Sequence, residues 1–357
     1  MEEQKRKLSR KTILIIALCI LIVLLAGWGI YRRYFTKEGG GLGIFYKLTT
    51  APSAIQALSL LDGKYYSQDV ANRHPLAIMI ENSPDARPQT GLTKASIIYE
   101  AITEGGITRF MAIFGPQSSK KVGPVRSARS FFLDWAAEYD AFYAHVGGSL
   151  EALDKIKEYN IKDLNQFSIG SKAFWRLPQA GKATEHTMYT NTDKLWQIAN
   201  QNKWSMIGAF PPLAFKKDLP SSQRPSSQTI TIDFSSPTFQ VVWQYNPSSN
   251  EYLRKMAGSL HKDGESGEQM KAKNVIVQYV ERWQASYKGQ QGVWQMKTIG
   301  EGRTKVFLDG QTIEGTWKKV HRSARTKFYE STGKEIQFNA GVFWYEIVPP
   351  EISVTSQ

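Results

Sequence analysis

The sequence holds one cysteine, Cys19, among its 357 residues. A single cysteine cannot form an intramolecular disulfide bond, and no cysteine–histidine spacing typical of zinc sites is present. Disulfide scaffolds, zinc fingers and iron–sulfur proteins are therefore excluded. The chain also has no GxSxG, Walker A, HExxH or GxGxxG sequence, so the motifs of common hydrolases and nucleotide-binding enzymes are missing as well.

Acidic residues are in the minority. The 45 lysines and arginines exceed the 32 aspartates and glutamates, which sets the formal net charge at +13. Part of this excess lies in the first eleven residues, and the remainder of the chain stays basic. A basic surface predicts an anionic partner: nucleic acid, anionic lipid, a phosphate compound or an acidic wall polymer. The length and an apolar content of 41% predict about two folded domains.

An apolar run without charge or proline covers residues 13–30. As a helix it would extend about 27 Å, enough to cross a thin bilayer. Because basic residues precede it, we expect a cytoplasmic segment over 1–11 and a transmembrane helix over 12–30. A cleaved signal peptide is the alternative, but no A-x-A site follows the run, and Cys19 lies inside it rather than after it as in a lipoprotein. The rest of the chain is then expected outside the cell, which argues against a nucleic-acid partner.

Short apolar runs alternate with helical patterns over residues 73–219, after a stalk and lead-in over 31–72. This alternation predicts a layered α/β domain, with a central sheet covered by helices on both faces. The expected strands cover 75–80, 96–101 and 108–114, and the expected helices cover 131–139, 149–159 and 191–201.

The composition changes at residues 220–228, where prolines and serines without periodicity predict a linker. From 229 to 357 the sequence consists of alternating, aromatic and β-branched runs separated by turn residues. These predict a smaller all-β C-terminal domain.

Polar residues gather where the strands of the predicted α/β domain end. Glu81 and Asn82 directly follow the run 75–80, and open α/β sheets bind ligands at the carboxyl ends of their strands. The other residues of this candidate ligand-binding site are Arg87, Arg109, Arg126, Arg129, His145, Gly147 and Gly148. Glu100 and Glu104 flank the neighbouring strands.

Arg126 and Arg129 stand just before a predicted helix. Guanidinium groups beside the free N–H groups of a helix start suit a phosphate or pyrophosphate. Gly147 and Gly148 would allow close approach of a ligand to the backbone, and His145 would lie near the same rim. Each residue alone also fits a structural role, such as an ion pair that closes a loop. Their convergence at successive strand ends favours the binding hypothesis.

Two further groups of polar residues fit more than one role. A basic loop contains Arg176, Lys182, His186 and Tyr189, and it fits an ordinary surface loop as well as a binding loop. In the β region, His261 and Asp263 could cap a turn or line a cleft between the domains.

Several stretches carry a family resemblance, among them HPLAIMIENSPDARPQTGL, KVGPVRSARSFFLDWAAEYDAFYAHVGGS, FLDGQTIEGTW and FNAGVFWYEIVP. Over about residues 73–350 the chain resembles the YerB-like family of bacterial envelope proteins. The function of that family is essentially unassigned, and its members are commonly lipoproteins. The resemblance implies a location in the cell envelope, here with a spanning helix in place of the lipid-bearing cysteine.

The order of these motifs is also similar to that of the LytR-CpsA-Psr phosphotransferases. That resemblance implies transfer of glycopolymers from polyprenyl pyrophosphate carriers to peptidoglycan with magnesium. Glu81 matches the metal-binding acid, Arg126 the arginine after a proline, and Gly147–Gly148 the diglycine. Ser96 and Ser127 stand where that family has aspartates, and loss of a carboxylate removes a ligand that magnesium requires.

The first hypothesis is therefore a membrane-anchored, extracytoplasmic protein of the bacterial cell envelope. It would bind a phosphate, pyrophosphate or glycopolymer in an arginine-lined cleft, and the sequence indicates no certain cofactor, with magnesium as the candidate. One alternative is a magnesium-dependent phosphotransferase or hydrolase in which Glu81 holds the metal. The other is a scaffold for envelope proteins. The expected partners are the membrane, a polyprenyl-phosphate-linked or wall polymer ligand and, for the scaffold, other envelope proteins.

Overall fold

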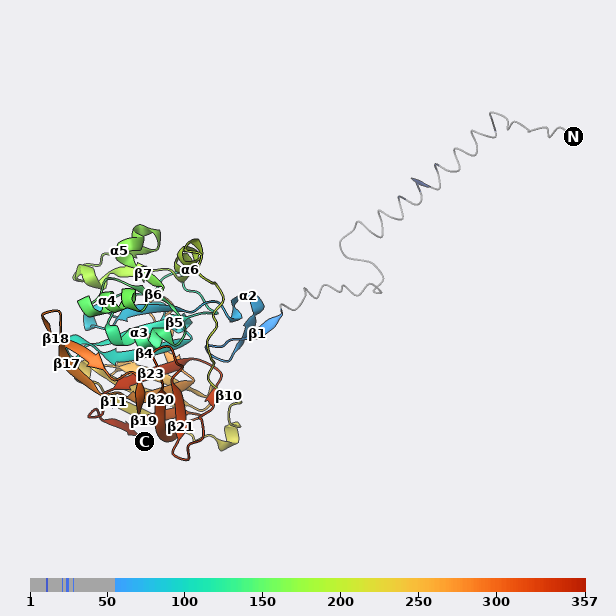
Figure 1. Ribbon diagram of the computed structural model, residues 1–357. Coiled ribbons are helices and arrows are strands. Elements are labelled where there is room, and N and C mark those ends of the chain that lie inside the picture. The colour runs from blue at the N-terminus through green and yellow to red at the C-terminus, as the bar shows by residue number, and fades with distance from the viewer. Residues whose placement is uncertain (1–10, 12–20, 22–23, 26–27, 29–54) are drawn as a thin grey trace. The chain divides into compact units, whose positions relative to one another are not determined.

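The computed structural model describes residues 55–357 together with Lys11, Leu21, Leu24, Leu25 and Trp28 (Figure 1). Apart from those five positions, the expected cytoplasmic segment, spanning helix and first part of the stalk lie outside the described residues. Among the residues that are described, no helix is long and apolar enough to cross a membrane.

A ten-stranded sheet forms the centre of the structure, with the strand order β21-β20-β19-β16-β23-β4-β5-β3-β6-β7. Half of its strands precede residue 220 and half follow residue 229, so both parts of the sequence build it. Its strands are β3 (Leu76–Glu81), β4 (Ile97–Ile102), β5 (Thr108–Phe114), β6 (Phe142–His145), β7 (Asp163–Asn165), β16 (Asn274–Tyr279), β19 (Gly300–Leu308), β20 (Gln311–Lys319), β21 (Lys327–Glu330) and β23 (Phe343–Val348).

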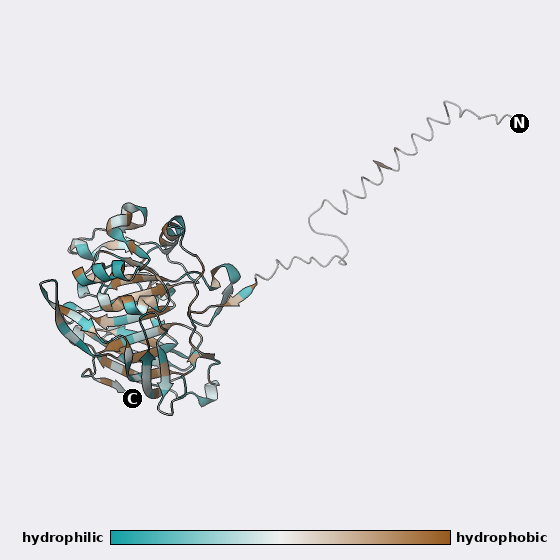
Figure 2. Cartoon of the chain, viewed as in Figure 1, coloured by the Kyte–Doolittle hydropathy of each residue, from teal (hydrophilic) through white to brown (hydrophobic). Residues whose placement is uncertain are grey.

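The two halves of this sheet join where β4 pairs with β23 in parallel, with Ile97 opposite Phe343. Both strands are buried along their whole length. Continuous apolar runs are typical of strands covered on both faces, and Figure 2 shows the hydrophobic colour along the central strands. Residues 55–357 accordingly form one compact unit.

A second sheet, entirely antiparallel, has the order β14-β13-β12-β11-β24, and β15 pairs with β13. Alternate residues of β12 and β13 are buried, as expected where one face of a sheet packs and the other meets solvent. The buried face, with Ile232 and Trp243, shares a hydrophobic core with Phe110 and Trp344 of the large sheet. The strands are β11 (Thr229–Asp233), β12 (Gln240–Asn246), β13 (Glu251–Met256), β14 (Ser259–Leu260), β15 (Lys271–Ala272) and β24 (Val354–Ser356).

The longer helices lie where the spacing predicted them. They are α3 (Ser130–Ala137), α4 (Leu150–Glu158) and α6 (Thr192–Gln201). Ser149 caps α4 by accepting a hydrogen bond of 3.2 Å from the Ala152 N–H, which satisfies one of the free donors of the first turn. Phe132 of α3 packs in one core cluster and Leu195 of α6 in the other, so helices contribute to the cores on both faces of the large sheet.

The remaining elements are short. Helices α2 (Gln68–Ala71) and α5 (Gln166–Ile169) are single turns, and the predicted linker contains one 3-10 turn, Ser221–Gln223. Two-stranded ribbons are formed by β1 (Gln56–Leu58) with β2 (Tyr65–Ser67), β8 (Phe174–Arg176) with β9 (Met188–Thr190), β10 (Phe215–Lys216) with β22 (Phe338–Asn339), and β17 (Arg282–Tyr287) with β18 (Gln290–Met296).

Candidate functional site

One edge of the large sheet collects the carboxyl ends of β3, β4, β6 and β7. These strands run in the same direction, because β3 and β4 are both antiparallel to β5 while β6 and β7 are parallel to β3. Glu81 is the last residue of β3, and Arg109 of β5 is directly opposite it. Five charged residues meet at this edge, which we call the arginine edge: Glu81, Glu104, Arg109, Arg126 and Arg129.

Arg126 is held at the edge by its backbone and its side chain. Its N–H donates a hydrogen bond of 2.9 Å to the carbonyl oxygen of Met79, which ties the loop to β3. Its Nε forms an ion pair with Oε2 of Glu81. The side chain of Glu81 is only 2% exposed, whereas that of Arg126 is 28% exposed. Part of the Arg126 guanidinium therefore faces solvent while the carboxylate does not.

Arg129 forms a bidentate ion pair with Glu104. Its Nη2 donates a hydrogen bond of 2.8 Å to Oε2, and its Nε donates to Oε1. Glu104 begins the 3-10 turn Glu104–Gly106 between β4 and β5, and its side chain is 49% exposed. Partial burial raises the pKa of Glu104, but the hydrogen bonds and charge of Arg129 outweigh it and leave the pKa lowered. This fork-to-carboxylate contact is the geometry by which arginine recognises an oxyanion.

Arg109 lies behind these pairs and is almost fully buried. Its Nη1 donates a hydrogen bond of 2.9 Å to the carbonyl oxygen of Ser127. Burial, reinforced by the charge of Arg129, lowers the pKa of Arg109 to about 10, against the opposing effect of Glu81 and Glu104. Arg109 is thus still charged at neutral pH. Three guanidinium groups face two carboxylates, which leaves the arginine edge with one positive charge in excess.

His186 also reaches the arginine edge. Its Nδ1 lies 3.8 Å from Oε2 of Glu81 and 3.4 Å from Oγ of Ser83. His186 belongs to the basic loop that was predicted to be separate from this edge, whereas Arg176 of the same loop donates to the carbonyl oxygen of Thr184 within the loop itself. No pattern in the sequence links position 186 to position 81, because the loop approaches β3 only through the tertiary fold.

His145 and the two glycines shape the edge. Both ring nitrogens of His145 are engaged, one 2.8 Å from Oδ1 of Asp163 and the other 2.6 Å from the carbonyl oxygen of Gly147. Gly147 has a φ of +57°, a conformation that glycine adopts without strain. A Cβ on Gly148 would lie 3.2 Å from that of Ala128. These residues therefore bring the strand end close to the loop that carries Arg126 and Arg129.

Asn82 and Arg87 lie in a different environment. Asn82 is fully buried, and its Nδ2 donates hydrogen bonds of 2.6 Å to Oγ1 of Thr108 and 3.2 Å to Oε1 of Glu100. Arg87 donates to Oδ1 and to the carbonyl oxygen of Asn82, at 3.2 and 3.0 Å. Its third acceptor is the carbonyl oxygen of Thr238 at the second sheet. The structure thus assigns this pair to the contact between the two sheets.

The donor set around Glu81 does not fit a magnesium ion, which takes oxygen ligands. Glu81 forms an ion pair with Arg126, and Glu104, the other carboxylate of the arginine edge, forms one with Arg129. Ser96 precedes β4 and donates to Asp62 at the opposite edge of the sheet. Within the part of the chain that the structure describes, no group of three or more histidine, cysteine, aspartate or glutamate side chains could hold a metal.

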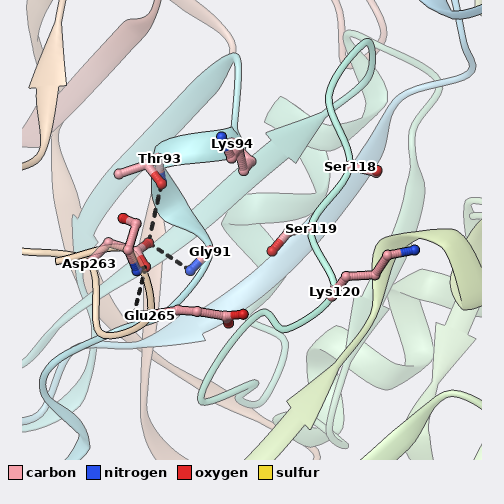
Figure 3. Close-up of a pocket in the computed structure, with 9 residues that line it drawn as sticks. Gly91, Thr93, Lys94, Ser118, Ser119, Lys120, Asp263 and Glu265 are labelled. Carbon is pink, nitrogen blue, oxygen red and sulfur yellow. Dashed lines mark hydrogen bonds between the residues drawn. The ribbon is translucent and has the colours of Figure 1, made fainter. Parts of the chain in front are cut away.

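A cavity of about 300 Å³ lies between the two parts of the sequence (Figure 3). Asp263 lines it and accepts hydrogen bonds from the N–H groups of Gly91 at 2.7 Å, Glu265 at 3.0 Å and Ser266 at 3.2 Å. Ser119 and Lys120 line the cavity from another loop. Asp263 therefore both caps its own turn and joins this turn to the loop at Gly91. Both oxygens of its carboxylate accept hydrogen bonds.

Comparisons with known proteins agree with one another. The family model described as "Protein of unknown function (DUF3048) N-terminal domain" matches residues 61–205, and the corresponding C-terminal domain matches residues 230–345. The chain is 31% identical over 294 residues to a Bacillus subtilis (strain 168) protein named "Putative lipoprotein YerB", covering 81% of this chain and 85% of that protein. The crystal structure of YerB protein from Bacillus subtilis superposes with a TM-score of 0.74 at 28% identity, covering 84% of this chain and 99% of that one.

Proposed function

This chain belongs to the YerB-like family, whose two domains are described as being of unknown function, and we propose that it is a cell-envelope protein that binds a phosphate-type anion at the arginine edge. The relative's name describes a lipoprotein, and the apolar run over 13–30 of this sequence supports an anchor of another kind. With that anchor, residues 55–357 lie outside the cytoplasm, where wall polymers and lipid-linked phosphates are found.

One observation carries the proposal: Arg126 and Arg129, three residues apart in one loop, each hold a carboxylate at the carboxyl edge of the sheet. Groups that hold a carboxylate with a planar fork also hold phosphate. Arg109 supplies a further positive charge that neither carboxylate neutralises.

The exposed carboxylate is the one a ligand can replace. Glu104 is followed by Gly105 and Gly106, whose φ values are +63° and +74°, and its side chain is half-exposed. Rotation of this side chain into water would free the Arg129 fork. Glu81 is buried and stays in place, so we expect it to orient Arg126 rather than to leave it.

The test is isothermal titration of the full chain in detergent with inorganic pyrophosphate at low salt. We expect saturable binding that weakens at least tenfold in Arg126→Ala and Arg129→Ala and is unchanged in Arg303→Ala, an exposed arginine of β19. Equal affinities in all three variants, or no binding to the wild type, would overturn the proposal.

The same titration separates the alternatives when it is repeated with Mg²⁺. Release of inorganic phosphate only when Mg²⁺ is present would replace the binding hypothesis with the phosphotransferase or hydrolase hypothesis. Absence of pyrophosphate binding, together with envelope proteins that co-purify in stoichiometric amounts, would replace it with the scaffold hypothesis.

A further inference from the structure

A second cavity, of about 340 Å³, opens beside the turn between β13 and β14. Arg87 and Pro88 line it from the first part of the sequence, and Met256, Leu260 and Lys262 line it from the second. None of the five residues of the arginine edge belongs to its wall. Its volume is at the lower end of the range for ligand pockets, which suits a small molecule.

Arg87 is a preorganised cation without a counter-charge. Among the residues that the structure describes, no carboxylate oxygen lies within ion-pair distance of its guanidinium. Three hydrogen bonds, to Asn82 and Thr238, fix the group, and it also stacks over Phe239 at 5.1 Å from the ring centre. A guanidinium has five N–H donors, so two remain for a ligand.

The charge of Arg87 persists under physiological conditions. Burial lowers its pKa to about 10, with the charge of Arg254 acting in the same direction and that of Glu100 opposing it. The group is therefore protonated at neutral pH. A partly buried charge without a counter-ion at ion-pair distance is costly, and an anion in the cavity would lower that cost.

The floor of the cavity is polar but neutral. His261 is buried, with its Nδ1 2.6 Å from Nη1 of Arg254 and its Nε2 3.0 Å from Oε1 of Gln89. Burial, with the charges of Arg254 and Arg87, lowers the pKa of His261 well below its ordinary value. Nδ1 of the neutral ring therefore accepts from Arg254, and Nε2 donates to Gln89. Neither His261 nor Gln89 therefore presents an unpaired side-chain acceptor that would repel an anion.

Most of the remaining wall is apolar. It consists of Pro88, Met256, Ala257 and Leu260, with Ser259 as a polar member, and 48% of the Leu260 surface is exposed. An exposed leucine beside a pocket is available to a ligand, although a lone exposed leucine elsewhere would need no explanation.

We propose that this cavity binds a small amphiphilic anion, namely a carboxylate or phosphate monoester that carries a short aliphatic chain. Its oxyanion contacts the free donors of Arg87 and the ammonium group of Lys262, and its chain lies against Pro88, Met256 and Leu260. This site is separate from the arginine edge, and it does not depend on the function proposed there.

The test uses hexanoate and hexyl phosphate as probes in isothermal titration of the full chain. Acetate has the charge without the chain, and hexanol has the chain without the charge. We expect saturable binding of at least one hexyl anion, with acetate and hexanol at least tenfold weaker. The two hexyl anions also show which oxyanion the site prefers. No saturable binding of either anion, or equal affinity for hexanol, would overturn the proposal.

Variants place the binding in this cavity. Leu260→Ser shortens the apolar wall at an exposed position, so folding is retained, and should weaken binding about tenfold. Val320→Ser is the control, since Val320 is 81% exposed and outside the cavity wall.

Arg87→Gln should abolish the preference for the anion over hexanol, with thermal unfolding as the check on folding. Arg129→Ala should leave the preference for hexanoate over acetate unchanged, because that preference comes from the apolar wall of this cavity. Equal losses in Leu260→Ser and Val320→Ser, or a loss of that preference in Arg129→Ala, would refute this location.

Discussion

Arg254 of β13 forms an ion pair with Glu100 of β4 in the interior between the two sheets, and both side chains are fully buried. The guanidinium of Arg254 also lies 4.5 Å from the ring centre of Trp344. Glu100 additionally accepts hydrogen bonds from Thr108 and Asn82. This pair joins a strand of the N-terminal family domain to a strand of the C-terminal one, so it couples the stability of the two.

Removing Arg254 should be strongly destabilising. Arg254→Ala leaves Glu100 as an uncompensated buried charge, and we expect a loss of about 3–5 kcal/mol in the free energy of unfolding. Lys318→Ala is the control, because Lys318 pairs with Glu301 at the surface, where such pairs contribute about 0–1 kcal/mol. Urea unfolding of both variants provides the comparison. A loss below about 1 kcal/mol for Arg254→Ala would show that water solvates Glu100.

Glu346 should make the protein less stable as the pH rises. It is fully buried and faces Trp243, Glu100 and Arg254. Burial and the negative charge of Glu100 raise its pKa well above its ordinary value of 4.5, against the effect of Arg254. A carboxyl group with a raised pKa in the folded state stabilises the fold while it is protonated. This stabilisation is fully present below the pKa of the group in the unfolded chain, and it is lost as the pH rises through the pKa of the group in the folded protein.

Glu346→Gln tests this pH dependence because the amide keeps the shape without titrating. The variant should lose less stability than the wild type as the pH rises above the pKa of the unfolded chain, as measured by urea unfolding at each pH. Glu301→Gln, at an exposed acid, should follow the wild type. Parallel curves for wild type and Glu346→Gln would mean that Glu346 titrates alike in the folded and unfolded chains.

Glu104→Gln should increase anion binding at the arginine edge. The change removes the carboxylate that pairs with Arg129, so an anion no longer has to displace it. For a half-exposed ion pair this should strengthen anion binding by about 1 kcal/mol, or about fivefold in affinity. Pyrophosphate titration measures the effect, with Glu301→Gln as a control for net charge. If both variants gain equally, long-range charge rather than release of Arg129 is responsible.

Gly147→Ala should destabilise the strand end beside the arginine edge. The positive φ of Gly147 costs about 1 kcal/mol for alanine, and a Cβ would lie 2.8 Å from Cε2 of Phe167. Gly105 is the matched control, because its φ is +63° and nothing lies within 4 Å of its Cβ position. Thermal unfolding should therefore show a larger loss for Gly147→Ala, and Phe167→Ala should remove the difference. Equal losses would mean that the Phe167 ring moves aside freely.

The strands and helices that position the candidate site could be predicted from local pattern. The apolar runs at 75–80 and 108–114 are β3 and β5, and Ser149 is the expected cap of α4. Glu81 and Arg109 could be placed at strand ends because the boundary of an apolar run is a local property. Their position opposite each other was not predictable, because strand pairing depends on the whole sheet.

The family, the order of the elements and the basic residues at the strand ends could be recognised from the amino-acid pattern, because each depends on neighbouring residues and their spacing. The folded chain was needed to show that β23 pairs with β4, that His186 lies near Glu81 and that Arg87 lines a cavity instead of lying beside Arg126. Such contacts join residues far apart in the chain. They form because burying both sheets against each other stabilises the fold more than any local preference does, and a sequence pattern with a period of a few residues contains no record of them.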